Sequence, residues 1–181
     1  MATETLLYTL FYDKSIQILK ADDPKQVVAE TKTAGEIVAM ALAGSQLWVA
    51  DNKGVVKILN ADTLQPEGEE LKTVYGHPAV SMNSSKDGSM VAVGDTKGYV
   101  TLFDTATRAQ KSYTAPHQNK VLEINFTDDN RVASVGFDKL LCVEALKMSC
   151  PNGVALTNSF CIFKDCVLTA GYDCAIRKYK F

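Results

Sequence analysis

The sequence predicts an all-β protein built from a hairpin that recurs along the chain. In each copy an apolar strand runs into a tight polar turn, and a second strand with alternating polar and apolar residues follows. Gly, Asn and Asp, which tolerate left-handed backbone angles, stand in or beside these turns. No stretch carries a long apolar stripe at helical spacing, so the pattern indicates strands throughout.

Five stretches carry the hairpin. The predicted strand pairs are 7–10 with 15–19, 47–50 with 55–59, 90–94 with 99–103, 132–136 with 140–143, and 167–171 with 175–179. Further strands are expected before or after these hairpins, at 26–29, 37–42, 80–82 and 121–126. The recurring unit is therefore expected to have four antiparallel strands.

The turns recur at a nearly constant interval. The matched turn positions Asp13, Lys53, Lys97, Asp138 and Asp173 are separated by 40, 44, 41 and 35 residues. Four-stranded propeller blades repeat about every 40–45 residues, so all intervals but the last fit. We expect a single domain over 1–181, a partial β-propeller of about four to five blades of antiparallel strands. The expected blades are approximately 1–33, 34–73, 74–115, 116–149 and 150–181.

The first and last blades are expected to be incomplete. The chain starts on what would be a blade's second strand and ends on what would be a blade's third strand. Open ends of this kind would expose apolar blade faces and unpaired strand edges. We therefore expect the chain to belong to a larger propeller, or to be completed by another chain or by self-association.

Signature residues of a known repeat family are present in degenerate form. Gly76-His77 heads the third repeat and Phe103-Asp104 closes its hairpin, which resembles the Gly-His and Trp-Asp frame of WD40 proteins. Residues 84–94 are similar to the turn and strand of that family. In other repeats the Trp-Asp pair is replaced, by Leu59-Asn60, Glu144-Ala145 and Tyr179-Lys180. The resemblance implies a WD40-type β-propeller.

A narrower resemblance covers the chain from Gln46 to its C-terminus. Residues 48–59, 64–71, 91–104 and 167–181 are similar to the C-terminal propeller of the actin-interacting protein family. Proteins of that family work with cofilin to disassemble actin filaments. The resemblance implies a protein–protein interaction module that promotes cofilin-dependent disassembly of actin. The alternative is a structural scaffold subunit of another multiprotein complex with no actin link.

His117, Ser134 and Asp138 fall within one repeat and could be mistaken for a hydrolase triad. A triad needs an exposed nucleophile and an oxyanion site. In the WD40 pattern the histidine precedes the inner strand, the serine lies on the second strand and the aspartate on the following turn, where they form a buried structural network. We expect this network, and no enzymatic activity.

Partner-binding residues of a propeller are expected in the loops between its strands. Aromatic and charged residues at predicted loops are the candidates, because aromatic anchors dominate many interfaces; they are Tyr75, His77, Lys97, Tyr113, Phe137 and Tyr172. Packing between blades or a solvated loop tip is the alternative for each. His77 is expected to be a loop residue without equivalent partners, since Val93 and Lys97 occupy the places that match Ser134 and Asp138.

Composition and charge give no reason to expect nucleic acid, a membrane or a cofactor. The formal net charge is −2 at pH 7, and no basic block is interleaved with aromatic residues. No apolar run approaches the ~18 residues that span a bilayer, and the N-terminus does not resemble a signal peptide. The cysteines are Cys142, Cys150, Cys161, Cys166 and Cys174. Their odd number favours buried thiols in a reducing compartment over a disulfide framework. Only one pair, Cys161 and Cys166, has the spacing of zinc ligands, and no second pair or later histidine accompanies it. We expect a cytoplasmic protein, cytoskeletal if the actin resemblance holds, with protein partners and no metal.

Overall fold

The computed structural model describes residues 5–144, 146–149, 157–164, 166–172 and 174–180. Its strands form five antiparallel sheets, each made of strands that follow one another along the chain. We number these sheets blades 1 to 5. Blade 1 contains β1 (Leu6–Leu10), β2 (Ser15–Lys20) and β3 (Val27–Lys32). Blade 2 contains β4 (Ile37–Ala43), β5 (Gln46–Asp51), β6 (Val55–Asn60) and β7 (Leu71–Lys72).

The remaining strands repeat the same order. Blade 3 contains β8 (Ala79–Ser84), β9 (Met90–Asp95), β10 (Val100–Asp104) and β11 (Ala109–Thr114). Blade 4 contains β12 (Val121–Phe126), β13 (Val132–Gly136), β14 (Leu140–Val143) and β15 (Leu146–Ser149). Blade 5 contains β16 (Thr157–Phe163), β17 (Cys166–Gly171) and β18 (Ile176–Lys180). A single 3₁₀ turn, η1 (Val74–Gly76), joins blades 2 and 3.

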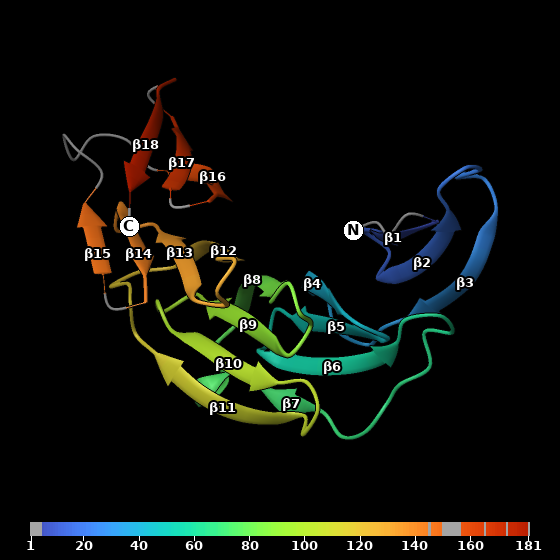
Figure 1. Cartoon of the computed structure of the whole chain (residues 1–181). Helices are drawn as coiled ribbons and strands as arrows, with labels where there is room; N and C mark the ends of the chain where they lie inside the picture. Colours follow the sequence, from blue (N-terminus) through green and yellow to red (C-terminus); the bar gives the residue numbers. More distant parts are fainter. Residues whose placement is uncertain (1–4, 145, 150–156, 165, 173, 181) are drawn as a thin grey trace.

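The blades are arranged radially in an open arc (Figure 1). Strand β4 contacts β8, β8 contacts β12, and β12 contacts β16, so the first strands of blades 2 to 5 line the inner side of the arc. Strands β7, β11 and β15 lie on the outer side (Figure 1). This arrangement confirms the predicted all-β, partial propeller.

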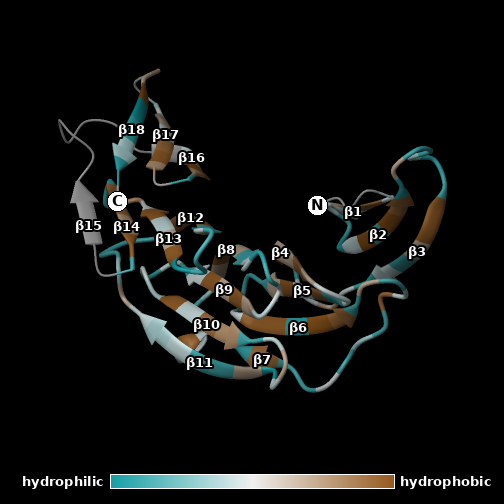
Figure 2. Cartoon of the chain, viewed as in Figure 1, coloured by the Kyte–Doolittle hydropathy of each residue, from teal (hydrophilic) through white to brown (hydrophobic). Residues whose placement is uncertain are grey.

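Apolar side chains are buried between neighbouring blades, as the alternating strand pattern requires. Trp48 and Phe103 are completely or almost completely buried and pack against each other between blades 2 and 3, with ring centroids 5.8 Å apart. Similar clusters lie between blades 1 and 2, 3 and 4, and 4 and 5. Figure 2 shows the contrast between the apolar strand β6 and the largely polar outer strand β11. Each blade therefore depends on its neighbour to shield its apolar faces from water.

One backbone position repeats in all five blades. In blades 2 to 5 this position lies in the turn between the second and third strands, and in blade 1 it lies in the turn between β1 and β2. One residue of each turn adopts the left-handed conformation. These residues and their φ angles are Lys14 at 69°, Gly54 at 76°, Gly98 at 92°, Lys139 at 67° and Cys174 at 59°. The recurrence shows that the hairpins are copies of one local design, although their turn residues differ.

Candidate protein-interaction face

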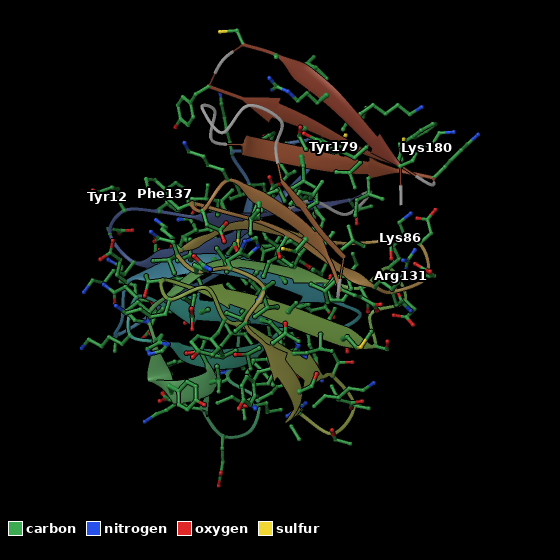
Figure 3. The ribbon with its side chains drawn as sticks, turned by 90° about the vertical axis from the view of Figure 1, so that its left-hand side faces the viewer. Tyr12, Lys86, Arg131, Phe137, Tyr179 and Lys180 are labelled. Atoms are coloured by element: carbon green, nitrogen blue, oxygen red, sulfur yellow. The ribbon has the colours of Figure 1, made fainter. Side chains whose placement is uncertain are left out.

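The five hairpin turns lie on one face of the arc, which we call the aromatic face. Within the described residues it consists of the turns at 11–14, 52–54, 96–99, 137–139, 172 and 174, together with the loops between blades at 33–36, 73–78 and 115–120. Figure 3 shows Tyr12 and Phe137 projecting on one side of the molecule, and Lys86 and Arg131 projecting on the other. The loops around Lys86 and Arg131 belong to the opposite face.

Aspartates at the strand ends hold two of the turns. Asp51 Oδ1 accepts hydrogen bonds from the backbone N–H groups of Lys53 at 2.9 Å and Val55 at 2.8 Å. Asp95 Oδ1 accepts the equivalent bonds in blade 3, from Lys97 at 2.8 Å and Tyr99 at 2.9 Å. Both carboxylates are buried, and a buried carboxylate needs such partners. Each lysine is consequently carried on a turn whose backbone is fixed.

The structure brings His117, Ser134 and Asp138 together. His117 Nδ1 lies 2.9 Å from Asp138 Oδ1, and Nε2 lies 2.8 Å from Ser134 Oγ. The backbone N–H of Gln118 donates to Asp138 Oδ2 at 2.9 Å. His117 and Ser134 are both buried, so the group ties the loop that enters blade 4 to the turn between β13 and β14.

His77 lies in a loop and has a partner at a position that the match with blade 4 does not predict. Its Nδ1 lies 3.1 Å from Asp95 Oδ2. Asp95 is the last residue of β9. The residue of blade 3 that matches Asp138 of blade 4 is Lys97, two positions further on. One carboxylate oxygen of Asp95 holds the turn and the other faces His77, so blade 3 reaches a similar loop-to-turn link from a different position.

Four aromatic rings gather beside this link, and we call them the Tyr75 cluster. The ring of Tyr75 lies 5.3 Å from Tyr99, 6.0 Å from Tyr113 and 5.9 Å from His77, measured between centroids. The Tyr75 and Tyr113 rings meet edge to face at 72°, a favourable arrangement for aromatic pairs. Tyr75, His77 and Tyr113 are among the residues that the sequence predicts for partner binding, and Tyr99 joins them in the structure.

The Tyr75 cluster is exposed but held in place. The side chain of Tyr75 is 66 % exposed and that of Tyr113 is 46 % exposed. The hydroxyl groups of these two residues are 3.4 Å apart, and this hydrogen bond raises the pKa of Tyr75 above its usual value. The neighbouring Val74 N–H donates to the buried Thr101 Oγ1 at 3.0 Å. Tyr75 itself has a φ of 58°, an uncommon conformation for a residue with a large side chain.

Other exposed aromatic residues stand on the remaining turns of this face. Phe137, 50 % exposed, belongs to the β13–β14 turn, and Tyr172, 71 % exposed, belongs to the β17–β18 turn. Tyr12, which is fully exposed on the β1–β2 turn, is not among the partner-binding residues predicted from the sequence. A signal was available, because Tyr12 directly precedes Asp13 as Phe137 precedes Asp138.

Lysines surround these aromatic residues. Lys14, Lys53, Lys97 and Lys120 are all exposed. Across the described ranges none of the four forms an ion pair. Lys97, a proposed partner-binding residue, extends from the same turn as Tyr99 of the Tyr75 cluster. The aromatic face therefore combines exposed aromatic side chains with four exposed lysines that form no ion pair within the described residues.

The opposite face is rich in acidic residues. Its loops carry mainly acidic residues: Asp22, Asp23, Asp62, Glu67, Glu69, Glu70, Asp87, Asp104, Asp128, Asp129 and Glu144. Several of its basic residues are already paired: Lys86 with Asp128, Arg108 with Glu67 at 2.5 Å, and Arg131 with Asp129 at 2.8 Å. The two faces would consequently attract partners of different charge.

Cysteines and metal ligands give no second site in the part of the chain that the structure describes. Cys142 and Cys166 are buried, as expected for core packing, whereas Cys161 and Cys174 are exposed, so that expectation is wrong for these two. Cys150 lies outside the described residues. Among those residues, no group of three His, Cys, Asp or Glu side chains could hold a metal ion. None of their helices is long and apolar enough to cross a bilayer.

Radially arranged antiparallel sheets of three or four described strands, with loops on two faces, define the chain as a β-propeller. Comparison with known families then gives a more specific assignment. The family model for the Vps8 β-propeller matches residues 25–175, so the chain belongs to the Vps8 β-propeller family. The resemblances to WD40 repeats and to the actin-interacting family are not tested by this match and stay predictions. A search of curated proteins finds no match.

A solved structure supports the same fold. The computationally designed protein Ika8 is similar to this chain with a TM-score of 0.81 and 13% sequence identity. The similarity covers 100% of this chain and 57% of the designed protein. At this identity the likeness shows the fold alone.

Proposed function

We propose that the chain is a protein-interaction module that binds an acidic surface of another protein through the aromatic face, as a subunit of a multiprotein assembly. One observation carries the proposal: exposed aromatic residues and lysines that form no ion pair within the described residues occur together on one face. Propellers commonly bind through their loops.

The two kinds of side chain have different parts in this proposal. The lysines attract an acidic partner and orient its approach. Tyr75 and Tyr113 then bury apolar surface at the contact, and tyrosine loses little conformational entropy when it does so. The contacts within the Tyr75 cluster hold the rings in advance, which reduces the cost of binding.

Charge reversal on one face tests the proposal. We expect Lys53→Glu combined with Lys97→Glu to lower the recovery of partner proteins in affinity purification by about tenfold or more, since charge pairs at an interface govern encounter and register. The matched control reverses two lysines on the opposite face, Lys25→Glu with Lys164→Glu, and should retain recovery. Thermal melting verifies that both variants fold. Equal recovery with both variants would remove the aromatic face as the binding surface.

A role in cofilin-dependent disassembly of actin filaments is a narrower form of this proposal, and it rests on the sequence resemblance. Cosedimentation with actin filaments, with and without cofilin, separates it from the general scaffold function. Absence of binding and of disassembly in both conditions would leave the scaffold function alone.

We also propose a non-catalytic, cytoplasmic role. Burial of Ser134 within the His117 network supports a structural use of these residues. The cysteine content supports a reducing compartment.

A further inference from the structure

A groove separates blades 3 and 4 on the outer side of the arc. Its volume is about 550 Å³, within the range of roughly 300–1,000 Å³ found for ligand pockets. One wall comes from β9, β10 and β11 of blade 3, and the other from β13, β14 and the residue after β14. The apolar lining residues are Met90, Val100, Leu102, Ala115, Pro116 and Val132.

The groove lies where blade 4 lacks the large apolar residue that the other blades carry at one position of the repeat. Phe103 on β10 pairs with Val91 and fills the boundary between blades 2 and 3. The equivalent residue of blade 4 is Glu144, whose N–H donates to the carbonyl of Val132 at 2.9 Å. Because Glu144 is exposed and charged, it cannot fill the boundary between blades 3 and 4 as Phe103 fills the previous one.

The inner half of the boundary between blades 3 and 4, in contrast, is well packed. Trp48 of blade 2 corresponds in register to Ala92 of blade 3, since Trp48 pairs with Ile58 and Ala92 with Leu102. Phe126, at the end of β12, is buried against Ala92 and restores the lost volume. Phe126 of the neighbouring blade therefore fills the space that the small side chain of Ala92 leaves. At Glu144 the space left by the missing apolar side chain stays open as the groove.

The open half has the composition of a binding groove. Half-buried apolar side chains, including Leu102 and Val132, form its floor together with the buried Cys142. Lys111 and Glu144 are exposed at its rim. The groove reaches from the loop at Ala115 to Asn130, on the turn between β12 and β13, and so it crosses the blade from one face to the other. An extended peptide segment suits this length and shape.

We propose that the groove binds an aromatic side chain of a partner polypeptide, with a basic residue next to it facing Glu144. The aromatic side chain takes the place that Phe103 occupies between blades 2 and 3. The positive neighbour complements the Glu144 carboxylate at the rim. This site is separate from the aromatic face, and its partner segment is basic where the partner of that face is acidic.

Short peptides test the groove directly. The probe is acetyl-Ala-Lys-Trp-Ala amide, and the matched control peptide has Ala in place of Trp. Binding is followed by NMR of methyl-labelled methionines, since Met90 lines the groove and Met40 lies between blades 1 and 2. We expect the Trp peptide to shift the Met90 methyl signal and leave Met40 unchanged, with at least tenfold weaker binding of the Ala peptide. Equal binding of the two peptides, or a shift confined to Met40, would overturn the proposal.

Variants that fill the groove from either wall provide the second test. Glu144→Phe and Ser112→Trp should each weaken binding of the Trp peptide at least tenfold, and one folded variant suffices. Glu144→Gln should lose only the part of the affinity due to the lysine of the peptide. The double variant Lys53→Glu, Lys97→Glu should bind the peptide as the wild type does. Its behaviour therefore distinguishes a failure of the groove proposal from a failure of the proposed binding through the aromatic face. Unchanged binding by a folded, filled variant, or equally tight binding of N-acetyl-tryptophanamide, would contradict a peptide groove.

Discussion

At the scale of single residues, the left-handed turn position shows two solutions to one backbone requirement. Gly54 and Gly98 lie under the loops that enter the next blade, and a Cβ at Gly98 would stand 2.2 Å from the carbonyl oxygen of His117. Lys14 and Lys139 take the same conformation with a side chain. Glycine is thus required in blades 2 and 3 by both conformation and space, and a lysine in blades 1 and 4 pays a conformational cost to place a charge on the turn.

Substitutions at this position should have opposite effects. We predict that Gly98→Ala lowers the free energy of unfolding by about 2 kcal/mol or more, because backbone strain and a steric clash add. Lys14→Gly should raise it by up to about 1 kcal/mol, since relief of the left-handed strain exceeds the greater flexibility of unfolded glycine. Urea denaturation of both variants measures the difference. A stabilising Gly98→Ala would show that the turn and the His117 loop do not meet as described.

At the scale of the hairpin, side-chain acceptors decide how firmly a turn is held. Asp13 Oδ1 accepts a hydrogen bond from Ser15 Oγ at 2.6 Å and another from Ser15 N–H at 3.1 Å, and Lys32 lies 3.2 Å from the other oxygen. The Ser15 hydroxyl bond is the main cause that lowers the pKa of Asp13 to about 2. The ionised carboxylate is therefore the form that stabilises the turn between β1 and β2.

This hairpin should respond to acid in a defined direction. Because the folded pKa of Asp13 is below the unfolded value of about 3.9, its contribution is fully present above pH 4 to 5 and is lost as the pH falls toward 2. We predict that Asp13→Asn lowers the urea midpoint at pH 7 and that the gap from the wild type narrows between pH 5 and pH 3. Solvent exposure of the pair keeps the effect small. A gap that does not change with pH would contradict this role.

The hairpins were predictable because their signals are local. Alternating apolar residues and turn residues within a few positions determine strands such as β9 and β10. The partner of His77 was not predictable by matching positions, because it depends on which way the second oxygen of Asp95 faces. The short strand β7 follows a long loop and has only two residues, too few for a periodic signal. The groove at Glu144 needs the register of two blades, which the sequence alone does not provide.

At the scale of the whole molecule, the two end blades are less covered than the three between them. In blade 1 no described strand pairs with the inner edge of β1, and in blade 5 none pairs with the outer edge of β18. Apolar side chains are exposed in both blades: Val27, Val28, Phe163 and Ile176. Unpaired strand edges next to exposed apolar residues favour association with another chain.

We therefore predict that the 181-residue polypeptide, when it is studied by itself, associates at micromolar concentration through its end blades. Ile176→Asp places a charge on β18, where the native side chain is 79 % exposed, and it should lower the average mass measured by light scattering. Tyr75→Asp removes an exposed aromatic side chain from the loop between blades 2 and 3, away from both end blades, and should leave the mass unchanged. The pair separates association through strand edges from general stickiness of exposed aromatic residues. A wild-type chain that stays monomeric over this concentration range would show that the unpaired strand edges of the end blades do not bind a second copy.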